Sequence, residues 1–508
     1  MQAGRIETDR VLIVGGGIAA LYAALILAPR PVLLITPDPL GSGASSAWAQ
    51  GGIAAAMARD DRPARHLADT IRAGAGLVDE VVAARVTEEA AAHVARLAEF
   101  GAPFDRDRHG NYLLSREAAH GTARVVRVGG DRAGQAIMAV LSRAVQAATH
   151  VQVATGLSAV GLILGSGRVS GIRVEGDGCG EIRAPAVLIA GGGAAGLYAV
   201  STNPVRIRGQ MLGMAAQAGA VIRDAEFVQF HPTAIDTGED PAPLATEALR
   251  GEGAILINAE GHRFMQALAP EAELAPRDIV ARGVFAESQG GRRPMLDARG
   301  LGERIALTFP TVYAACQRAG LDPATQPIPV TAAAHYHMGG IAVDMAGRSS
   351  LNGLWVAGEA ACTGLHGGNR LASNGLLEAL VYARAAAIDI AEVVPVMPAD
   401  EAEIRLSGSA PAIDQGTVAR LRALMSARVG VIRNESGLRA MLQDISEMEP
   451  GAPPALANML IAARMITTAA LLRRESRGAH CRSDFPGCLP PRSSRLTLAD
   501  ALTVKEPA

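Results

Sequence analysis

The sequence predicts an α/β fold in which a Rossmann-like nucleotide-binding domain is interrupted by an inserted α+β domain and followed by a C-terminal helical domain. A short apolar strand near the N-terminus runs into glycines and then into a helical pattern. Two later apolar strands also end at glycine or at an acidic residue, and a region with a different sequence pattern separates them. The expected spans are 1–223 and 337–402 for the nucleotide-binding domain, 224–336 for the inserted domain, and 403–508 for the helical domain and tail.

The first strand and helix carry a dinucleotide fingerprint, Gly15-x-Gly17-x-x-Ala20. The apolar run 11–14 is typical of a buried parallel strand, and a second strand at 31–36 follows the helix, as a βαβ unit requires. Gly15 permits the tight turn, Gly17 lets the backbone approach a pyrophosphate, and Ala20 lets helix and strand pack closely. The phosphates are expected over the positive end of the helix dipole.

The segments before the inserted domain have mixed character. Residues 41–52 are rich in small side chains, which indicates either close approach to a ligand or an ordinary flexible loop. The polar stretch 111–134 is typical of a solvated surface or of the lining of a polar cleft. The patterns predict helices at 81–100, 131–148 and 209–220, antiparallel strands within 151–174 and a buried strand in 184–193.

Nucleotide-domain character returns after the inserted region. A third strand, 351–358, ends at Glu359, and a glycine-rich loop precedes a helix at 373–393. A linker is expected at 395–411, and amphipathic helices are expected from there to Leu472. Beyond Arg477 the chain is rich in proline and serine, and we expect this tail to be partly disordered.

The composition excludes several classes of function. A net charge of −2 offers no broad field for nucleic acid or acidic lipid. No apolar run has the length of a membrane span, and the N-terminus lacks a signal-peptide layout, so we expect a cytoplasmic protein. Lysine occurs only at Lys505, which excludes Schiff-base enzymes. The five cysteines include no CxxC pair, so no metal or iron–sulfur site is expected.

The strands also indicate which dinucleotide is bound. Three buried strands ending in glycine or acid, with a domain inserted before the third, favour FAD over NAD. Glu359, at the end of the third strand, is placed to accept hydrogen bonds from a ribityl chain.

Many stretches resemble one flavoprotein superfamily. They are AQGGIAAAM (49–57), GGGAAGLY (191–198), EFVQFHPTA (226–234), TEALRGEGAILINAEGHRFM (246–265), APRDIVARG (275–283), AAHYHMGGI (333–341), VAGEAACTGLHGGNRLASNGLLEALVY (356–382) and RESRGAHCR (474–482). In them the chain resembles, almost from end to end, the succinate dehydrogenase and fumarate reductase flavoproteins, and within these most closely the L-aspartate oxidase family. SREAAHGTARVVRVGGDRAG (115–134) resembles the segment that supplies a glutamate near the substrate amine in aspartate oxidases.

The resemblance implies FAD as the cofactor and a capping role for the inserted domain. Succinate dehydrogenases carry a histidine, covalently bonded to FAD, where this chain has Ser45, so the FAD is expected to be non-covalent. The residues expected to contact FAD are Gly15, Gly16, Gly17, Ile18, Ala19, Thr36, Ser45, Gln50, Gly51, Gly52, Gln210, Glu359, Gly375 and Leu376.

The resemblance also implies the substrate contacts. Arg370 and His335 are expected to hold the α-carboxylate of L-aspartate, and His231 and Thr246 the side-chain carboxylate. Glu117 is expected to be the partner of the ammonium group. Arg277 matches an arginine assigned to proton transfer in fumarate-reducing relatives, although an arginine suits charge stabilisation better.

The implied reaction is FAD-dependent oxidation of L-aspartate to iminoaspartate, with oxygen or fumarate as acceptor. In this family the reaction is the first step of de novo NAD biosynthesis, and iminoaspartate would pass to quinolinate synthase. A soluble fumarate reductase is the nearest alternative; it would use the same arginines and histidines but not Glu117. A flavin-binding scaffold for RNA modification or assembly is a further alternative, and it would need a basic face that a net charge of −2 does not suggest.

The chain departs from the usual family sequence around the cofactor. Gln210 stands where the family has an aspartate, Gly375 where it has a serine, and Thr36 lacks a long polar side chain. These departures predict weaker FAD binding. The usual REGGH has become Arg116-Glu117-Ala118-Ala119-His120, which retains the glutamate.

Overall fold

The structure is a computed structural model that describes residues 4–504, and Lys505 lies outside them. Its central element is a parallel sheet with the strand order β18-β11-β2-β3-β7. All residues of the first four strands in this order are buried, as in a sheet covered on both faces. The strands are β2 (Val11–Val14), β3 (Val32–Thr36), β7 (Val151–Thr155), β11 (Val187–Ile189) and β18 (Leu354–Val356). The predicted α/β class is confirmed.

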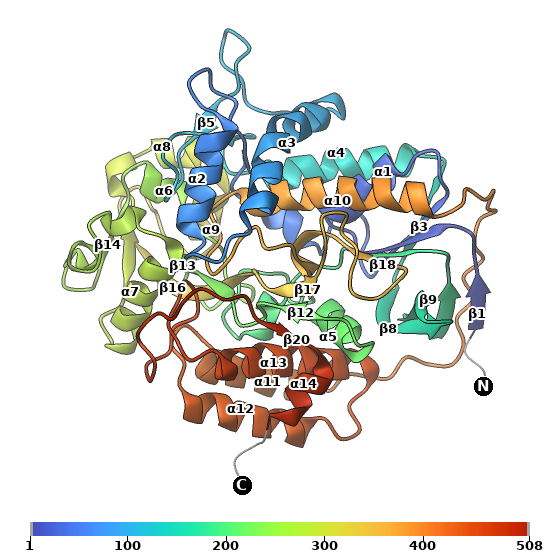
Figure 1. Ribbon diagram of the computed structural model, residues 1–508. Helices are drawn as coiled ribbons and strands as arrows, with labels where there is room; N and C mark the ends of the chain where they lie inside the picture. The colour runs from blue at the N-terminus through green and yellow to red at the C-terminus, as the bar shows by residue number, and fades with distance from the viewer. Residues whose placement is uncertain (1–3, 505–508) are drawn as a thin grey trace.

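Helices cover one face of this sheet, and a second sheet covers the other. The helical layer lies above the strands in Figure 1 and consists of α1 (Ile18–Ile26), α2 (Pro63–Ala73), α3 (Glu80–Glu99), α4 (Ala133–Ala147) and α10 (Asn374–Val393). The second sheet has the order β1-β10-β9-β8, and its apolar residues join one hydrophobic cluster with those of β2 and β3. Its strands are β1 (Gly4–Glu7), β8 (Ser158–Gly165), β9 (Arg168–Glu175) and β10 (Cys179–Arg183).

The prediction of antiparallel strands over 151–174 is wrong for its first part. β8 and β9 form the expected antiparallel hairpin, but β7 pairs in parallel with β3, with Val32 opposite Val151. β7 lies at the edge of the parallel sheet and is only half-buried. Its alternating sequence therefore imitates that of an antiparallel strand with one solvated face.

The inserted region forms its own sheet and its own hydrophobic cluster. The sheet is antiparallel, with the order β13-β16-β15-β14. Its elements are β13 (Val228–Ile235), α6 (Ala248–Gly251), β14 (Ile255–Ile257), α7 (Arg277–Gln289), β15 (Met295–Asp297), α8 (Arg304–Thr308), α9 (Pro310–Arg318) and β16 (Ile328–His337). We retain the predicted domain boundaries at 223/224, 336/337 and 402/403 as a proposal.

The C-terminal helices pack against the nucleotide-binding domain. They are α11 (Gln415–Arg428), α12 (Glu435–Met448) and α13 (Pro454–Leu472), and α13 packs on α5 (Gln210–Gln217). α12 buries one stripe, as predicted, but α13 is buried nearly all round, so the prediction of an amphipathic helix is wrong there. Among the described residues α13 alone is long and apolar enough to span a membrane, and 83% of its apolar window is buried inside the protein. It is a core helix.

The prediction of a partly disordered tail is wrong for the described residues. β20 (Arg495–Leu496) pairs with β12 (Ile222–Arg223), in a sheet completed by β17 (Gly340–Ala342) and β19 (Ala361–Cys362), and α14 (Leu498–Thr503) follows. His480 and Arg482 are fully buried. The proline and serine content indicates disorder when it is considered alone. The residues that pair with this segment lie far away in the sequence, so the local pattern does not reveal them.

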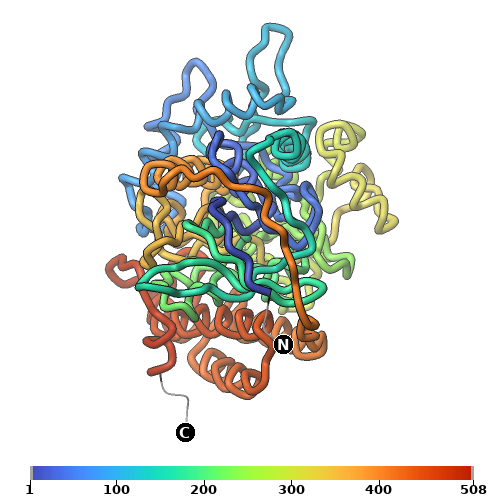
Figure 2. Tube along the Cα trace, turned by 90° about the vertical axis from the view of Figure 1, so that its right-hand side faces the viewer, coloured from blue at the N-terminus to red at the C-terminus, as the bar shows by residue number. Residues whose placement is uncertain are grey.

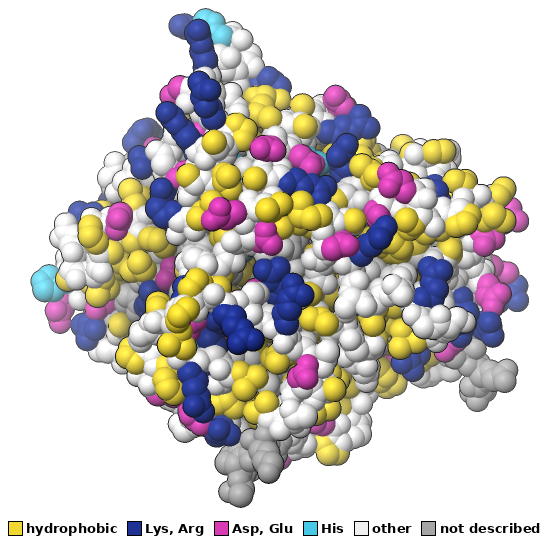
Figure 3. Space-filling view, in the orientation of Figure 1, with side chains coloured by type: hydrophobic (Ala, Val, Ile, Leu, Met, Phe, Trp, Pro, Cys, Tyr) yellow, Lys and Arg dark blue, Asp and Glu magenta, His cyan; other side chains and the backbone are white. Residues whose placement is uncertain are grey.

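The linker 395–411 follows the outside of the molecule. It runs down past β1 to the C-terminal helices, as the orange segment of Figure 2 shows, and Ser407 accepts a hydrogen bond from the Gly4 N–H at 3.1 Å. On the face shown in Figure 3, basic, acidic and hydrophobic side chains are interspersed, in keeping with the small net charge.

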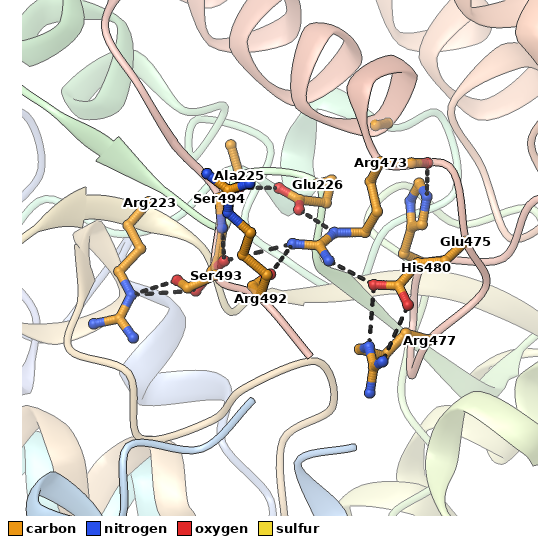
Figure 4. A network of polar contacts seen from close by, with 12 residues as sticks. Arg223, Ala225, Glu226, Arg473, Glu475, Arg477, His480, Arg492, Ser493 and Ser494 are labelled. Carbon is orange, nitrogen blue, oxygen red and sulfur yellow. Dashed lines mark hydrogen bonds and ion pairs between the residues drawn. The ribbon is translucent and has the colours of Figure 1, made fainter. Parts of the chain in front are cut away.

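A network of buried charges ties the tail to the start of β13 (Figure 4). Arg473, after the end of α13, bonds both to Glu226 and to Glu475. Ser494 donates to the second oxygen of Glu226 at 2.8 Å. Arg477 bonds to the second oxygen of Glu475 at 3.0 Å. Each buried carboxylate is thus met by donors, which the burial of a charge requires.

We expect Arg473→Met to lower the free energy of unfolding by about 3 kcal/mol, because it leaves the fully buried Glu226 short of its cation. Urea denaturation followed by circular dichroism measures this loss. The neighbouring Arg474 is exposed, so Arg474→Met is the matched control and should cost less than about 0.5 kcal/mol. Equal losses in the two variants would contradict a structural role for the network.

Candidate active site

One cavity of about 1020 Å³ extends from the carboxyl ends of the parallel strands to the inserted domain. Every residue that the sequence analysis predicted to contact cofactor or substrate lines it. Those predicted for the cofactor are Gly15, Gly16, Gly17, Ile18, Ala19, Thr36, Ser45, Gln50, Gly51, Gly52, Gln210, Glu359, Gly375 and Leu376. Those predicted for the substrate are Glu117, His231, Thr246, Arg277, His335 and Arg370.

The glycine turn after β2 leaves no room for side chains. Gly15 has a φ of 129°, and a Cβ there would lie 2.3 Å from the carbonyl oxygen of Ala190. A Cβ on Gly16 would lie 2.8 Å from Oγ1 of Thr36, whose hydroxyl donates to the Asp38 carbonyl. Because α1 begins directly after this turn, its positive end lies at the cavity wall and can receive phosphates.

The middle of the cavity is lined by polar groups from distant segments. Ser45 donates to the side-chain oxygen of Asn203 at 2.7 Å. Gln210 uses both ends of its amide on nearby backbone, at Arg208 N–H and Arg206 C=O. Glu359 accepts a hydrogen bond from the His337 N–H, and burial raises the pKa of its carboxyl to about 7. His337 itself is buried and bonds to the Ala225 carbonyl, so it packs rather than facing solvent.

Two histidines and an arginine meet at the far end of the cavity. His231 on β13 and His335 on β16 lie with ring centres 5.1 Å apart, and the guanidinium of Arg370 stacks on the Tyr336 ring at 4.2 Å. Burial, with the charge of Arg277 next, lowers the pKa of Arg370 to about 10. Burial and the nearby arginines lower the pKa values of both histidines well below the usual range, so both are neutral donors or acceptors at neutral pH.

Arg277 begins α7 and is fixed by two side chains. Its Nε donates to Glu247 at 2.6 Å, and its Nη1 donates to Gln229 at 2.9 Å. Burial acts to raise the pKa of Glu247, but Arg277 and Arg250 together hold it below its usual value. Sequence reasoning did not single out Glu247, although it directly follows the predicted Thr246 within a family-like stretch.

Glu117 lies in the loop between β5 (Leu114–Ser115) and β6 (Val125–Val126) and is 3% exposed. Its Oε2 accepts a hydrogen bond from the Ser373 hydroxyl at 2.8 Å. Burial, with the charge of Glu247 next, raises the pKa of its carboxyl to about 7. Not all of the stretch 111–134 is a solvated surface, because Glu117 within it places a buried carboxyl group at the cavity wall.

A relative covers almost the whole chain. The L-aspartate oxidase of Caulobacter vibrioides is 52% identical over 493 residues, which are 96% of this chain and 95% of the relative. The chain belongs to the L-aspartate oxidase family. The L-aspartate oxidase of Agrobacterium fabrum is 45% identical over 502 residues, covering 98% of this chain and 95% of the relative.

Family models and solved structures agree with this membership of the L-aspartate oxidase family. A model described as FAD binding domain matches residues 10–376, and one described as fumarate reductase flavoprotein C-term matches residues 454–505. An E. coli quinol fumarate reductase matches with a TM-score of 0.83 at 26% identity, covering 95% of this chain and 92% of that one. A quinol-fumarate reductase with menaquinol molecules matches with a TM-score of 0.85, also at 26% identity, covering 95% and 93%.

The residues of this L-aspartate oxidase family member fit FAD. The cavity lies at the upper end of the usual volumes of small-molecule sites, as a dinucleotide together with a substrate requires. Within residues 4–504, four buried atoms at the cavity lack a hydrogen-bond partner: Gln50 Oε1, Arg208 Nε, His231 Nε2 and Arg370 Nε. Together with the glycine turn at the start of α1, these atoms are suited to a polar ligand that runs the length of the cavity.

Proposed function

We propose that this protein oxidises L-aspartate to iminoaspartate with non-covalently bound FAD. The observation that carries the proposal is a buried carboxyl group, Glu117, in the same cavity wall as two arginines and two histidines. The cations and imidazoles suit the two carboxylates of a dicarboxylate. Only a substrate with an ammonium group also needs Glu117. Ser45, at the position of the covalent histidine in succinate dehydrogenases, supports non-covalent binding.

In this proposal the chain orients the substrate through its two carboxylates. Arg370 and His335 hold the α-carboxylate, and His231 and Thr246 hold the side-chain carboxylate. His231 Nδ1 accepts a hydrogen bond from the Thr233 N–H at 3.2 Å, so the ring proton is on Nε2, which can donate to the substrate. Arg277, fixed by Glu247, supplies a positive charge that does not move when the substrate binds.

Oxidation of the amine removes a hydride from the α-carbon and a proton from the nitrogen. Bound FAD supplies the acceptor for the hydride. The Glu117 carboxylate can hold the proton, because burial raises its pKa to about 7. The buried position of Glu117, 3% exposed, keeps water from competing for the ammonium group.

The wider role is also a proposal. Oxygen or fumarate would serve as the electron acceptor, and fumarate fits the same pair of carboxylate-binding groups. The reaction would be the first step of de novo NAD biosynthesis, with iminoaspartate passed to quinolinate synthase in the cytoplasm. The small net charge, and the interspersed charges on the face shown in Figure 3, support neither nucleic acid nor a membrane as a partner.

An anaerobic titration tests the activity. Purified protein with its FAD is mixed with L-aspartate, and the visible absorbance band of oxidised flavin is followed. We expect bleaching with L-aspartate but not with D-aspartate or succinate. A flavin that stays oxidised with L-aspartate, yet turns over fumarate after chemical reduction, would instead identify a soluble fumarate reductase.

A further inference from the structure

The loop that carries Glu117 is held by a closed set of contacts around His120. Within the loop the His120 N–H bonds to the Glu117 carbonyl at 3.2 Å, which closes a turn. Ala119 in this turn has a φ of 65°, a left-handed conformation that a residue other than glycine adopts only when its surroundings impose it. The turn in this chain therefore depends on contacts outside it.

The His120 ring provides two of those contacts. Its Nε2 lies 3.0 Å from the Ala372 carbonyl oxygen, and its Nδ1 lies 3.3 Å from Nη1 of Arg124. Because the guanidinium can only donate, Nδ1 accepts and the proton resides on Nε2, which donates to Ala372. Burial lowers the pKa of His120 to about 4, so this neutral tautomer persists at neutral pH.

The contact with Ala372 leads back to Glu117. The next residue, Ser373, donates its hydroxyl proton to Glu117 Oε2 at 2.8 Å. The segment 372–373 is therefore bonded both to His120 and to Glu117, three residues apart in the same loop. A shift of the imidazole would move the loop relative to Ser373 and with it the Glu117 carboxylate.

The other side of His120 is anchored in the helical layer. Arg124 is fully buried, and it bonds through two nitrogens to Asp61, just before α2, and through Nη1 to Asp69 within α2. Asp69 also accepts a hydrogen bond from the Gly121 N–H at 2.7 Å. The imidazole thus bridges the buried ion pairs of Arg124 and the segment 372–373, which bonds to Glu117.

We propose that His120 is a positioning residue that fixes Glu117 at the substrate ammonium group, and so sets the preference for an amino acid over a dicarboxylate without an amine. The inference rests on the proposed function, because it assigns Glu117 to the ammonium. Within residues 4–504, the hydrogen bonds and ring contacts of the His120 side chain go to Ala372, Arg124 and His66, and to none of the carboxylate-binding groups. Its loss should therefore affect L-aspartate oxidation and leave fumarate reduction in place.

The test compares L-aspartate oxidation with fumarate reduction by a reduced dye, in FAD-loaded His120→Phe. The phenyl ring fills the same space but makes neither hydrogen bond. We expect kcat/KM for L-aspartate to fall about tenfold or more, while fumarate reduction stays near the wild-type value. His120→Gln, whose amide can still donate to Ala372 and accept from Arg124, should restore most of the L-aspartate activity.

The matched control is His93→Leu. His93 is another buried histidine, hydrogen-bonded to Tyr22 at 3.1 Å in the helical layer, and its loss should leave the ratio of the two activities unchanged. If His120→Phe does not fold, Ser373→Ala breaks the same set of contacts at its other end and is judged by the same ratio. A wild-type ratio in the folded variant, or equal loss of both activities, would overturn the inference.

The two proposals fail in different ways. If the wild-type protein does not oxidise L-aspartate, the proposed function fails, and the assignment of His120 falls with it. If the wild type oxidises L-aspartate and Glu117→Gln does not, while His120→Phe keeps the wild-type ratio, only the inference about His120 is overturned.

Discussion

Arg370→Met should abolish L-aspartate oxidation and fumarate reduction together, with a loss of about a thousandfold in kcat/KM for each. Arg370 is 7% exposed, and its Nε has no partner among residues 4–504, so the guanidinium is kept ready for a ligand. Methionine keeps the packing on Tyr336 but loses a charged, bidentate donor. Steady-state kinetics with both substrates measure the loss, and the flavin absorbance of the purified variant shows whether FAD is retained.

Two further variants make the Arg370 result specific. Arg370→Lys retains the charge without the planar fork and should recover only part of the activity. Arg282→Met removes an arginine from α7 that bonds to Asp278 and to the Gly478 carbonyl, and it should leave both activities near wild type. Substantial L-aspartate oxidation by FAD-loaded Arg370→Met would remove Arg370 from the substrate site.

Glu117→Gln should separate the two activities. The neutral amide cannot balance an ammonium group, so we expect kcat/KM for L-aspartate to fall about a hundredfold while fumarate reduction is retained. The amide keeps the size of the carboxyl group and can still bond to Ser373. A parallel loss of fumarate reduction would show that the role of Glu117 is not confined to the substrate amine.

The pH profile gives a second readout of Glu117. Its pKa is raised to about 7, so the carboxyl group is protonated below that pH and ionised above it. Only the ionised form attracts the ammonium, and kcat/KM for L-aspartate should therefore rise as the pH increases through about 7. Glu359 also has a pKa of about 7, so the rise in kcat/KM can be assigned to Glu117 only if Glu117→Gln abolishes that rise.

Local patterns were enough to predict the fold class. The run 11–14, the glycine turn and the strand that ends before Glu359 each carry their signal within a few residues, and the structure assembles them into one sheet. β7 was misassigned because an edge strand and an antiparallel strand share the same alternation. α13 was misassigned because its burial depends on α5 and α12, which its own sequence does not show.

For the candidate site, the residues that line the cavity were predicted, but the residues that position them were not. The predicted residues all reach one cavity because they stand in family-like stretches that could be matched position by position. The residues that hold them were missed. Glu247 bonds to Arg277, and His120 bonds to Ala372. Both partners lie far away in the sequence, so no local spacing predicts these contacts. The assigned roles themselves remain predictions until the variants are measured.

The order of the strands in the central sheet determines when, during synthesis of the chain, the sheet can be completed. β11 pairs on one side with β2 and on the other with β18, which lies more than 150 residues further along the chain. A nascent chain that has emerged only to the inserted domain therefore exposes the apolar edge of β11. The cavity is also lined by Gly375 and Leu376, at the start of α10, and by Ala455 and Met459 in α13, all of which are synthesised later still. The complete cavity can thus form only after α13 has been synthesised, and a fragment that ends before β18 leaves the edge of β11 open, which invites aggregation.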